Sequence, residues 1–449
     1  MASRPHEEVR KIAPNLLLFA RPSALKDIYW NSAVNNKSEF YGTGALGSPA
    51  LFTTLDGKVH QQLRKTLGGN QWSIGFLKNT WEARIDDQIN LFVEKMTDFA
   101  KAEKEIVLSD KVAEFAADII TMLASTEPWG FVRNGRDERG MLESWRLGLP
   151  FFGLSGRWRW FRTNVIGNDH LAKFFLPAMN DKKGMGYLYA QANQEVSDRE
   201  TKMTREGKTF YMERPDYLQY CVEARDSITG QPLTPIQKRA HVILLIQAGA
   251  DSTGAALGST LRFFLLDIRI LVKARGEIEW VDRANKLSDP IAYEESRQLL
   301  PYMGACIKES LRLNPPDPNL FSRVVPPTGK EIDGVQVPPD TEVATVSFIV
   351  QRDPKLYAPD PEVYRPERWL EADAQEASEM EASQFVFGVG PRMCLGKDIA
   401  TMELWKLLPQ IIRTFDLMLI EPGQYVVTGG VAYNQDLKVQ LTLRNGKQE

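Results

Sequence analysis

The sequence predicts a mainly α fold, with one large helical body and small β-sheets at its margins. Three observations predict it. Apolar residues recur with helical periodicity from residue 60 to about residue 265. Runs of alternating or β-branched residues are confined to the two ends of the chain and to residues 324–348. No linker of distinct composition divides the 449 residues, so we expect a single domain.

The N-terminal elements are expected to be short. Residues 8–20 (EVRKIAPNLLLFA) predict two strands separated at Pro14-Asn15. Residues 22–30 predict a short helix, because Pro22 and Ser23 are typical helix start signals. Residues 38–57 contain several glycines and predict a long loop, and long loops inside compact domains are usually functional or disordered.

The segment 241–266 is apolar on nearly every face, which predicts a helix buried all round. Its centre nevertheless contains Gly249, Asp251, Ser252 and Thr253. A charge and two hydroxyls are costly to bury without partners. Two interpretations are open: a capped break between two helices, since Asp, Ser and Thr are good N-caps, or a functional polar notch. Apolar residues resume in register afterwards, which favours the notch.

The rest of the chain changes its pattern several times. The expected elements are, in order, a helix over 81–100 before the buried segment, a helix over 295–313 stopped by the prolines of 314–319, short strands over 324–348, a coil-like stretch over 352–385, a helix over 397–415, and a hairpin over 425–444 turning at Gly429-Gly430.

Composition excludes several classes of protein. The net charge of −3 and the absence of like-charge blocks argue against a nucleic-acid-binding protein. Three widely spaced cysteines without a CxxC exclude a disulfide scaffold and a zinc ribbon. No run of 18 apolar residues predicts a transmembrane helix, so we expect the chain as written to be soluble.

The stretch FVFGVGPRMCLG, residues 385–396, places Cys394 in a glycine-rich loop just before a predicted helix. The spacing fails both the dinucleotide and the Walker phosphate-loop patterns. A thiolate at such a turn is stabilised by backbone N–H groups and by the helix N-terminus, while Arg392 offers a cation to an anionic group beside it. An iron-ligating thiolate, with a cofactor that carries carboxylates, would use all of these features.

This loop resembles the haem-binding loop of the cytochrome P-450 superfamily, F-x-x-G-x-R-x-C-x-G. Phe387, Gly390, Arg392, Cys394 and Gly396 fill every fixed position. The resemblance implies a single-domain cytochrome P-450 fold over residues 1–449 that binds haem b (iron protoporphyrin IX). It makes Cys394 the axial ligand of the iron, with Gly388 also beside the haem.

Further motifs resemble the superfamily in the same order along the chain. HQQLR provides His60 and Arg64 for the haem propionates, and LFSRVVPP provides Arg323 for the same groups. AGADST resembles the signature of the helix over the haem, with Ala248 leaving room for oxygen and Asp251, Ser252 and Thr253 as candidates for proton delivery.

A further motif is ESLR. Its Glu309 and Arg312 are expected to form a buried structural network with Arg368 of PERW. Trp369 stands where phenylalanine is commoner in the superfamily. Phrases such as VRKIAPN and PSALKDIYW look like filamentous-fungal microsomal members, whose N-terminal anchor and first helix precede the first strand. Here the first predicted strand starts within ten residues, so we expect that the anchor and first helix are absent from the sequence as written. The resemblance therefore implies a parent protein anchored to the endoplasmic reticulum membrane and facing the cytoplasm.

The function implied is a monooxygenase that inserts one oxygen atom from O2 into a small apolar organic substrate, with fungal secondary metabolism as the expected setting. Oxidative coupling, rearrangement or dehydration are alternatives, and a non-catalytic haem sensor is a weaker one. Electrons would come from NADPH through a separate flavoprotein reductase, with Lys397 and Lys406 as candidate docking cations. We expect a monomer.

Two features concern the surroundings of the site. By family position the substrate walls would include Leu320, Phe321, Val427 and Thr428. Residues 149–161 (LPFFGLSGRWRWF) are unusually aromatic, and they predict either core packing or peripheral contact with a membrane.

Overall fold

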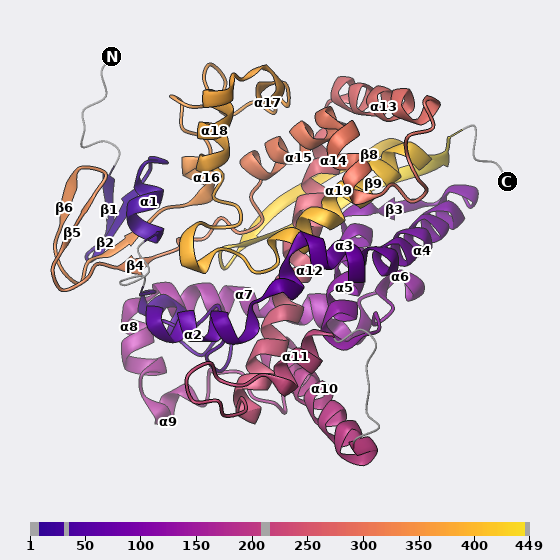
Figure 1. Ribbon diagram of the computed structural model, residues 1–449. Helices are drawn as coiled ribbons and strands as arrows, with labels where there is room; N and C mark the ends of the chain where they lie inside the picture. Colours follow the sequence, from indigo (N-terminus) through magenta and orange to yellow (C-terminus); the bar gives the residue numbers. More distant parts are fainter. Residues whose placement is uncertain (1–8, 31–35, 208–215, 445–449) are drawn as a thin grey trace.

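The computed structural model describes residues 9–30, 36–207 and 216–444. Figure 1 shows a body of helices through which the long helix α12 (Pro235–Leu266) runs, with small sheets at its margins. The predicted mainly α fold is confirmed. In the described part of the chain, no helix is both long enough and apolar enough to span a bilayer.

The helices vary from single turns to 32 residues. Besides α12 they are α1 (Ala24–Tyr29), α2 (Gly57–Leu67), α3 (Ile74–Thr80), α4 (Glu82–Lys101), α5 (Leu108–Ser125), α6 (Phe131–Asn134), α7 (Met141–Arg157), α8 (Arg159–Phe161), α9 (Asp169–Ala172), α10 (Gly184–Glu206), α11 (Tyr217–Glu223), α13 (Ile268–Arg283), α14 (Tyr293–Leu299), α15 (Pro301–Leu313), α16 (Ser347–Val350), α17 (Arg368–Glu371), α18 (Ala374–Ser383) and α19 (Lys397–Thr414).

The strands form three small sheets. The four-stranded sheet has the order β1 (Val9–Ala13), β2 (Leu16–Phe19), β7 (Glu342–Ala344), β4 (Arg323–Val324), the three-stranded sheet has the order β3 (Glu105–Val107), β9 (Val431–Leu443), β8 (Phe415–Thr428), and β5 (Lys330–Ile332) pairs with β6 (Val335–Val337). The two predicted N-terminal strands and the short helix after them are confirmed. The predicted C-terminal hairpin is also confirmed, although β8 begins at Phe415, ten residues earlier than expected.

Helix α12 is continuous through its polar centre, so the interpretation as two capped helices is wrong. It begins at a capping box in which Thr234 and Gln237 satisfy each other's backbone N–H groups, with Pro235 in the first turn. It packs against α5, α10, α15, α19 and β9. A Cβ atom at Gly254 would lie 2.9 Å from the Cα of Ala113, so this glycine allows α5 to approach closely.

Two predictions for the second half of the chain need correction. The helix expected over 295–313 is two helices, because Leu300 leaves the helical conformation just before Pro301. The coil-like stretch over 352–385 contains α17 and α18. Helix α18 forms because its sequence, AQEASEMEAS, is rich in helix-favouring residues and because Asp373 caps it in a capping box with Glu376.

A buried charge network joins α15 to the segment before the cysteine loop. Both carboxylate oxygens of Glu309 accept from Arg312 at 2.8 Å, and Oε1 also accepts from Arg368 Nε at 3.0 Å. The side chains of Glu309 and Arg312 are fully buried. Trp369 donates its indole N–H to Glu309 Oε2 at 2.9 Å, a hydrogen bond that phenylalanine could not make. The network therefore fixes the fold of residues 360–369 against α15.

We expect Glu309→Ala to lower the free energy of unfolding by about 3–5 kcal/mol, because it leaves two buried arginines without their common carboxylate. Trp369→Phe should cost less, about 1–3 kcal/mol, for one lost hydrogen bond to a charged group. Urea unfolding measures both. Glu381→Ala, which breaks the exposed pair with Lys308, is the control and should cost at most about 1 kcal/mol. A Glu309→Ala protein as stable as this control would contradict the structural role.

Candidate active site

The cysteine loop is shaped by tight turns that place Cys394 just before α19. The N–H of Cys394 donates to the carbonyl oxygen of Phe387 at 2.8 Å, which closes the loop. Gly388 and Gly390 both have positive φ, +66° and +72°, where glycine is favoured. A Cβ atom at Gly390 would also lie 2.4 Å from the carbonyl oxygen of Tyr29. The second glycine therefore allows the loop to lie directly on α1.

The groups around Cys394 have opposing effects on the pKa of its thiol. Cys394 keeps solvent-accessible surface, but the protein around it desolvates the thiol and so raises its pKa, and the charge of Asp317 adds to the increase. The N–H of Gly396, Arg64 and Lys397 lower the pKa and so favour the thiolate. The guanidinium of Arg64 also donates to the carbonyl oxygen of Met393 at 2.7 Å, which fixes α2 against the loop.

Five basic side chains gather beside this loop, and we call them the basic cluster: Lys37, His60, Arg64, Arg323 and Arg392. His60 and Arg64 lie one turn apart on α2, and Arg323 lies on β4. Lys37 is paired with Arg323 through an isolated β-bridge. Arg392 donates to the carbonyl oxygens of Thr54 and Leu55, both at 2.8 Å. The sequence motifs placed four of the five members, and the structure brings all five together.

The members of the basic cluster repel one another. Burial, together with the charges of Arg392, Lys37, Arg64 and Arg323, lowers the pKa of His60 to about 3. Burial and the charge of Arg323 lower the pKa of Arg392 to about 9. Burial, Arg323 and Arg392 hold the pKa of Lys37 well below its usual value. An anionic group placed among these side chains would relieve this repulsion.

Helix α12 divides the predicted proton-delivery residues between two faces. Ala248 is exposed and Ser252 is half-buried, one turn further along the same face, and Ser252 Oγ donates to the carbonyl oxygen of Ala248 at 2.6 Å. Asp251 and Thr253 are buried. The structure therefore brings Ala248 and Ser252 together on the open face, whereas Thr253 is packed into the protein.

Asp251 is paired with a residue that no sequence motif indicated. Arg146 of α7 donates from Nη2 to Asp251 Oδ1 at 2.7 Å and from Nε to Oδ2 at 3.1 Å. The Arg146 side chain is 23% exposed, against 1% for Asp251, and its guanidinium lies over the ring of Tyr433. Burial raises the pKa of Asp251, and Arg146 partly offsets this effect. The ion pair thus extends from the buried centre of α12 to a side chain that reaches the surface of the molecule.

The predicted substrate-wall residues lie in different surroundings. Phe321 packs edge-on against Phe385, with ring centroids 5.4 Å apart, and belongs to the hydrophobic core around α1. Leu320 is half-buried. Val427 and Thr428 lie at the tip of the β8–β9 hairpin, where Val427 is exposed and Thr428 is half-buried.

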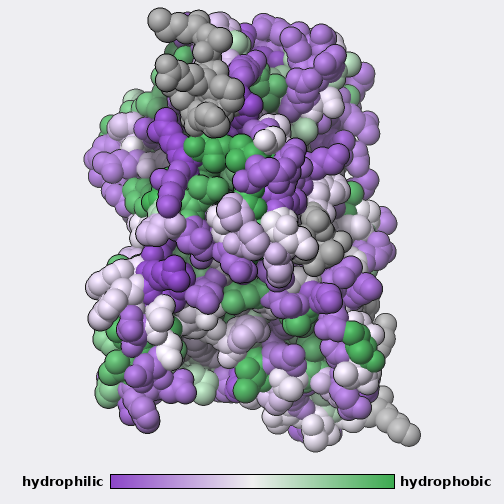
Figure 2. Space-filling view, turned by 90° about the vertical axis from the view of Figure 1, so that its left-hand side faces the viewer, coloured by the Kyte–Doolittle hydropathy of each residue, from purple (hydrophilic) through white to green (hydrophobic). Residues whose placement is uncertain are grey.

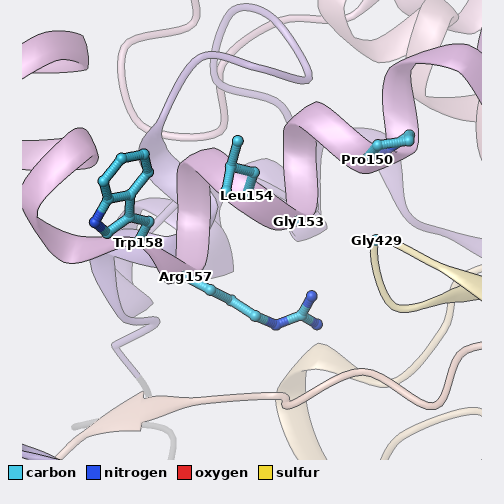
Figure 3. A pocket seen from close by; sticks show the side chains of 6 residues that line it. All are labelled: Pro150, Gly153, Leu154, Arg157, Trp158 and Gly429. Carbon is cyan, nitrogen blue, oxygen red and sulfur yellow. The ribbon is translucent and has the colours of Figure 1, made fainter.

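A groove of about 510 Å³ lies next to this hairpin tip. Figure 3 shows it between the second half of α7 and the turn at Gly429, and its lining consists of Pro150, Gly153, Leu154, Arg157, Trp158 and Gly429. It therefore combines apolar side chains with one basic side chain.

One of the two candidate docking lysines is not at the surface. Lys406 is fully buried, and its ammonium group is 2.8 Å from both Glu82 and Asp86 and donates to the carbonyl oxygen of Ile291. The prediction of Lys406 as a docking cation is therefore wrong, because α19 turns this residue toward α4. Lys397 is exposed at the start of α19.

The residues missed by sequence reasoning share a cause. Lys37 lies in a loop, and Arg146 lies in a helix far from any recognised motif. Only the three-dimensional structure shows that Lys37 belongs to the basic cluster and that Arg146 is paired with Asp251. The one available signal was indirect: Asp251 in a buried helix required a partner. Nothing in the sequence identified which arginine would supply it.

Known proteins resemble the chain over almost its whole length. A family model for cytochrome P450 matches residues 25–427. The chain is 31% identical over 438 residues to the cytochrome P450 monooxygenase gsfF of Penicillium aethiopicum, covering 96% of this chain and 84% of that protein. It is 28% identical to the cytochrome P450 monooxygenase ABA1 of Pyricularia oryzae over 452 residues, covering 98% and 85% of the two chains. It is 28% identical over 439 residues to the cytochrome P450 monooxygenase mpaDE of Penicillium brevicompactum, covering 95% of this chain and 49% of that protein. The chain therefore belongs to the cytochrome P450 family.

Proposed function

We propose that residues 1–449 form one haem-thiolate monooxygenase domain, which inserts one oxygen atom from O2 into a small organic substrate. Membership of the family makes the chain an oxidoreductase that uses haem and O2. The observation that carries the finer proposal is Cys394, held in a closed loop beside the basic cluster. Electrons come from NADPH through a separate flavoprotein reductase, and exposed Lys397 is a candidate contact for that reductase.

The residues present fit haem b. Its two propionates are anionic, and the basic cluster is a place where anionic groups would relieve repulsion between buried cations. Cys394 would hold the iron as a thiolate, stabilised by the Gly396 N–H, Arg64 and Lys397. Phe387, Gly388 and Gly396 shape the loop around it. When bound, haem supplies the iron at which O2 is activated for transfer to the substrate.

The chain's own residues would then position oxygen and move protons. Ala248 and Ser252 form the face of α12 that is open, so the Ser252 hydroxyl is the nearest candidate to deliver a proton. The Asp251 carboxylate would relay protons from water to this hydroxyl, while Arg146, which reaches solvent and stays protonated, would position that carboxylate. Thr253 is buried, and we assign it no direct part.

The substrate is proposed to be a fungal secondary metabolite, because the phrases at the start of the chain resemble filamentous-fungal members and the relatives above come from Penicillium and Pyricularia. The lining of the groove includes Gly429, which follows the proposed wall residue Thr428, and Arg157, which contacts Asn319 next to the proposed wall residue Leu320. Its apolar side chains suit a mainly apolar molecule.

We also infer peripheral contact with a membrane, at the cytoplasmic face of the endoplasmic reticulum, through an aromatic patch at α8, α9 and their flanks. Trp158, Trp160, Phe174 and Phe175 are each about half exposed or more, and Phe174 reaches 74%. Figure 2 looks onto the side where α8 and α9 lie and shows apolar residues among polar ones in its lower part. Arg159 supplies a positive charge beside them.

The proposal predicts that the reduced, carbon monoxide-bound protein shows the strongly red-shifted Soret band of a thiolate ligand, and that Cys394→Ala abolishes it. Cys221→Ala and Cys306→Ala are matched controls, because both thiols are buried in hydrophobic cores. They should leave the band unchanged. A normal band in Cys394→Ala would refute the assignment of the ligand.

Ser252→Ala should release more peroxide per NADPH oxidised and form less product. A positioned proton donor contributes about 10²- to 10⁴-fold, so even a partial loss should lower product yield by about tenfold. Thr253→Ala is the control for position, and Ser252→Thr, which keeps a hydroxyl, should retain most of the yield. Unchanged product per NADPH in Ser252→Ala would show that protons arrive by another route.

For the membrane patch, we expect a Trp160→Ser, Phe174→Ser variant to bind vesicles of phosphatidylcholine and phosphatidylserine at least about tenfold more weakly, because two large apolar side chains no longer enter the bilayer. Sedimentation with vesicles measures this. Trp280→Ser, on α13, removes an equally exposed tryptophan (70%) from another element and should have no effect. Equal binding of all three proteins would exclude the patch as a contact surface.

A further inference from the structure

The groove beside α7 contains a basic side chain whose hydrogen-bonding capacity is largely unused. Arg157 is the last residue of α7. Figure 3 shows its side chain extending away from the helix, on the side where the hairpin turn at Gly429 lies. Its Nη2 donates to Asn319 Oδ1 at 2.9 Å. Guanidinium carries five N–H donors, and within the described residues this is the only hydrogen bond that it makes.

The guanidinium is held in place from two sides. Asn319 is almost completely buried, and it lies directly before the proposed wall residue Leu320. Phe40 lies under the guanidinium, with its ring centroid 5.3 Å away. Arg157 is therefore oriented by a carboxamide and an aromatic ring, while the residue remains exposed where it lines the groove, so its other donors are accessible to a ligand. Such an oriented fork suits a carboxylate, which can accept two parallel hydrogen bonds.

The nearest acid does not neutralise Arg157. Asp317 is within electrostatic reach, but no ion pair joins the two side chains in the described part of the protein, and Asp317 Oδ1 is buried without a hydrogen-bond partner there. Burial raises the pKa of Asp317 to about 7, although Lys37, the Asn319 N–H and Arg157 oppose the increase. Asp317 is thus partly neutral near pH 7 and opposes a bound anion less than an ordinary aspartate would.

The groove is also close to the proposed chemistry. The charge of Asp317 raises the pKa of Cys394, so the two residues are close enough to interact. Asn319 begins the segment that leads to Leu320 and Arg323. Leu154 and Trp158 supply apolar walls on the other side of the groove. The groove has a volume of about 510 Å³ and is open to solvent, with Leu154 and Trp158 about half exposed.

We propose that Arg157 is a specificity-determining residue that binds a carboxylate of the substrate, so that the enzyme takes mainly apolar organic acids in preference to their neutral esters. This inference rests on the proposed monooxygenase function and names its substrate class. Leu154 and Trp158 contact the apolar part of the acid, and Asn319 positions the guanidinium.

The test compares dodecanoic acid with methyl dodecanoate by equilibrium dialysis against the haem-loaded protein. The wild type should bind the acid at least about tenfold more tightly than the ester, because a charge-assisted hydrogen bond is lost with the ester. Arg157→Gln should remove this preference by weakening the acid alone, and Arg157→Lys should keep part of it. Arg159→Gln removes another exposed arginine, two residues away and outside the lining of the groove; it is the control and should bind like the wild type.

Equal affinity of the wild type for acid and ester, or equal weakening of both by Arg157→Gln, would overturn the proposal. Loss of the cooperative unfolding transition in both Arg157 variants would also overturn it, by showing that Arg157 only holds the hairpin turn. The carbon monoxide spectrum of the same wild-type sample distinguishes failure of the proposed function from failure of the proposed role of Arg157. A missing thiolate band refutes the proposed function, whereas a normal band with no preference for the acid refutes only the role of Arg157.

Discussion

Repulsion among the buried cations beside the cysteine loop is the constraint on which the site depends. Lys37, His60, Arg64, Arg323 and Arg392 come from four separate segments of the chain, and burial and mutual repulsion lower the pKa values of several of them. Such a cluster opposes folding unless anions offset it. The propionates of haem would supply those anions, so binding of the cofactor and stability of the fold are expected to be linked.

The Glu309 network and helix α12 hold the remaining predicted site residues in place. The Glu309 network fixes the segment that leads to the cysteine loop, with Glu309 paired to two buried arginines and half-buried Asp360 as the second acidic partner of Arg368. Helix α12 keeps one open face, with Ala248 and Ser252, and pairs Asp251 with Arg146. The same arrangement leaves the Ser252 hydroxyl partly accessible and buries the Asp251 carboxylate.

Much of this could be predicted from sequence, because the signals were local. Helical periodicity and turn residues predicted α4, α12, α19 and the hairpin, and fixed spacings in motifs predicted the cysteine loop and the Glu309 network. Helix α18 was missed because proline and charge earlier in the stretch concealed a capping box at Asp373. Lys37, Arg146 and Arg157 were missed because their contacts join segments distant in sequence. Lys406 was misplaced because its helix face was unknown.

The most direct test of the central claim compares the acid sensitivity of the protein with and without haem. Burial and the neighbouring cations lower the pKa of His60 from its ordinary value of 6.5 to about 3. Between pH 6.5 and 3 the imidazole of His60 is protonated in the unfolded chain but stays neutral in the folded protein. The free energy of unfolding therefore decreases as pH falls through this range. Urea unfolding over this range should show a steeper loss for the haem-free wild type than for His60→Gln, with His170→Gln as an exposed control, and haem should reduce the difference. Identical pH dependence in all three proteins, with and without haem, would contradict the account.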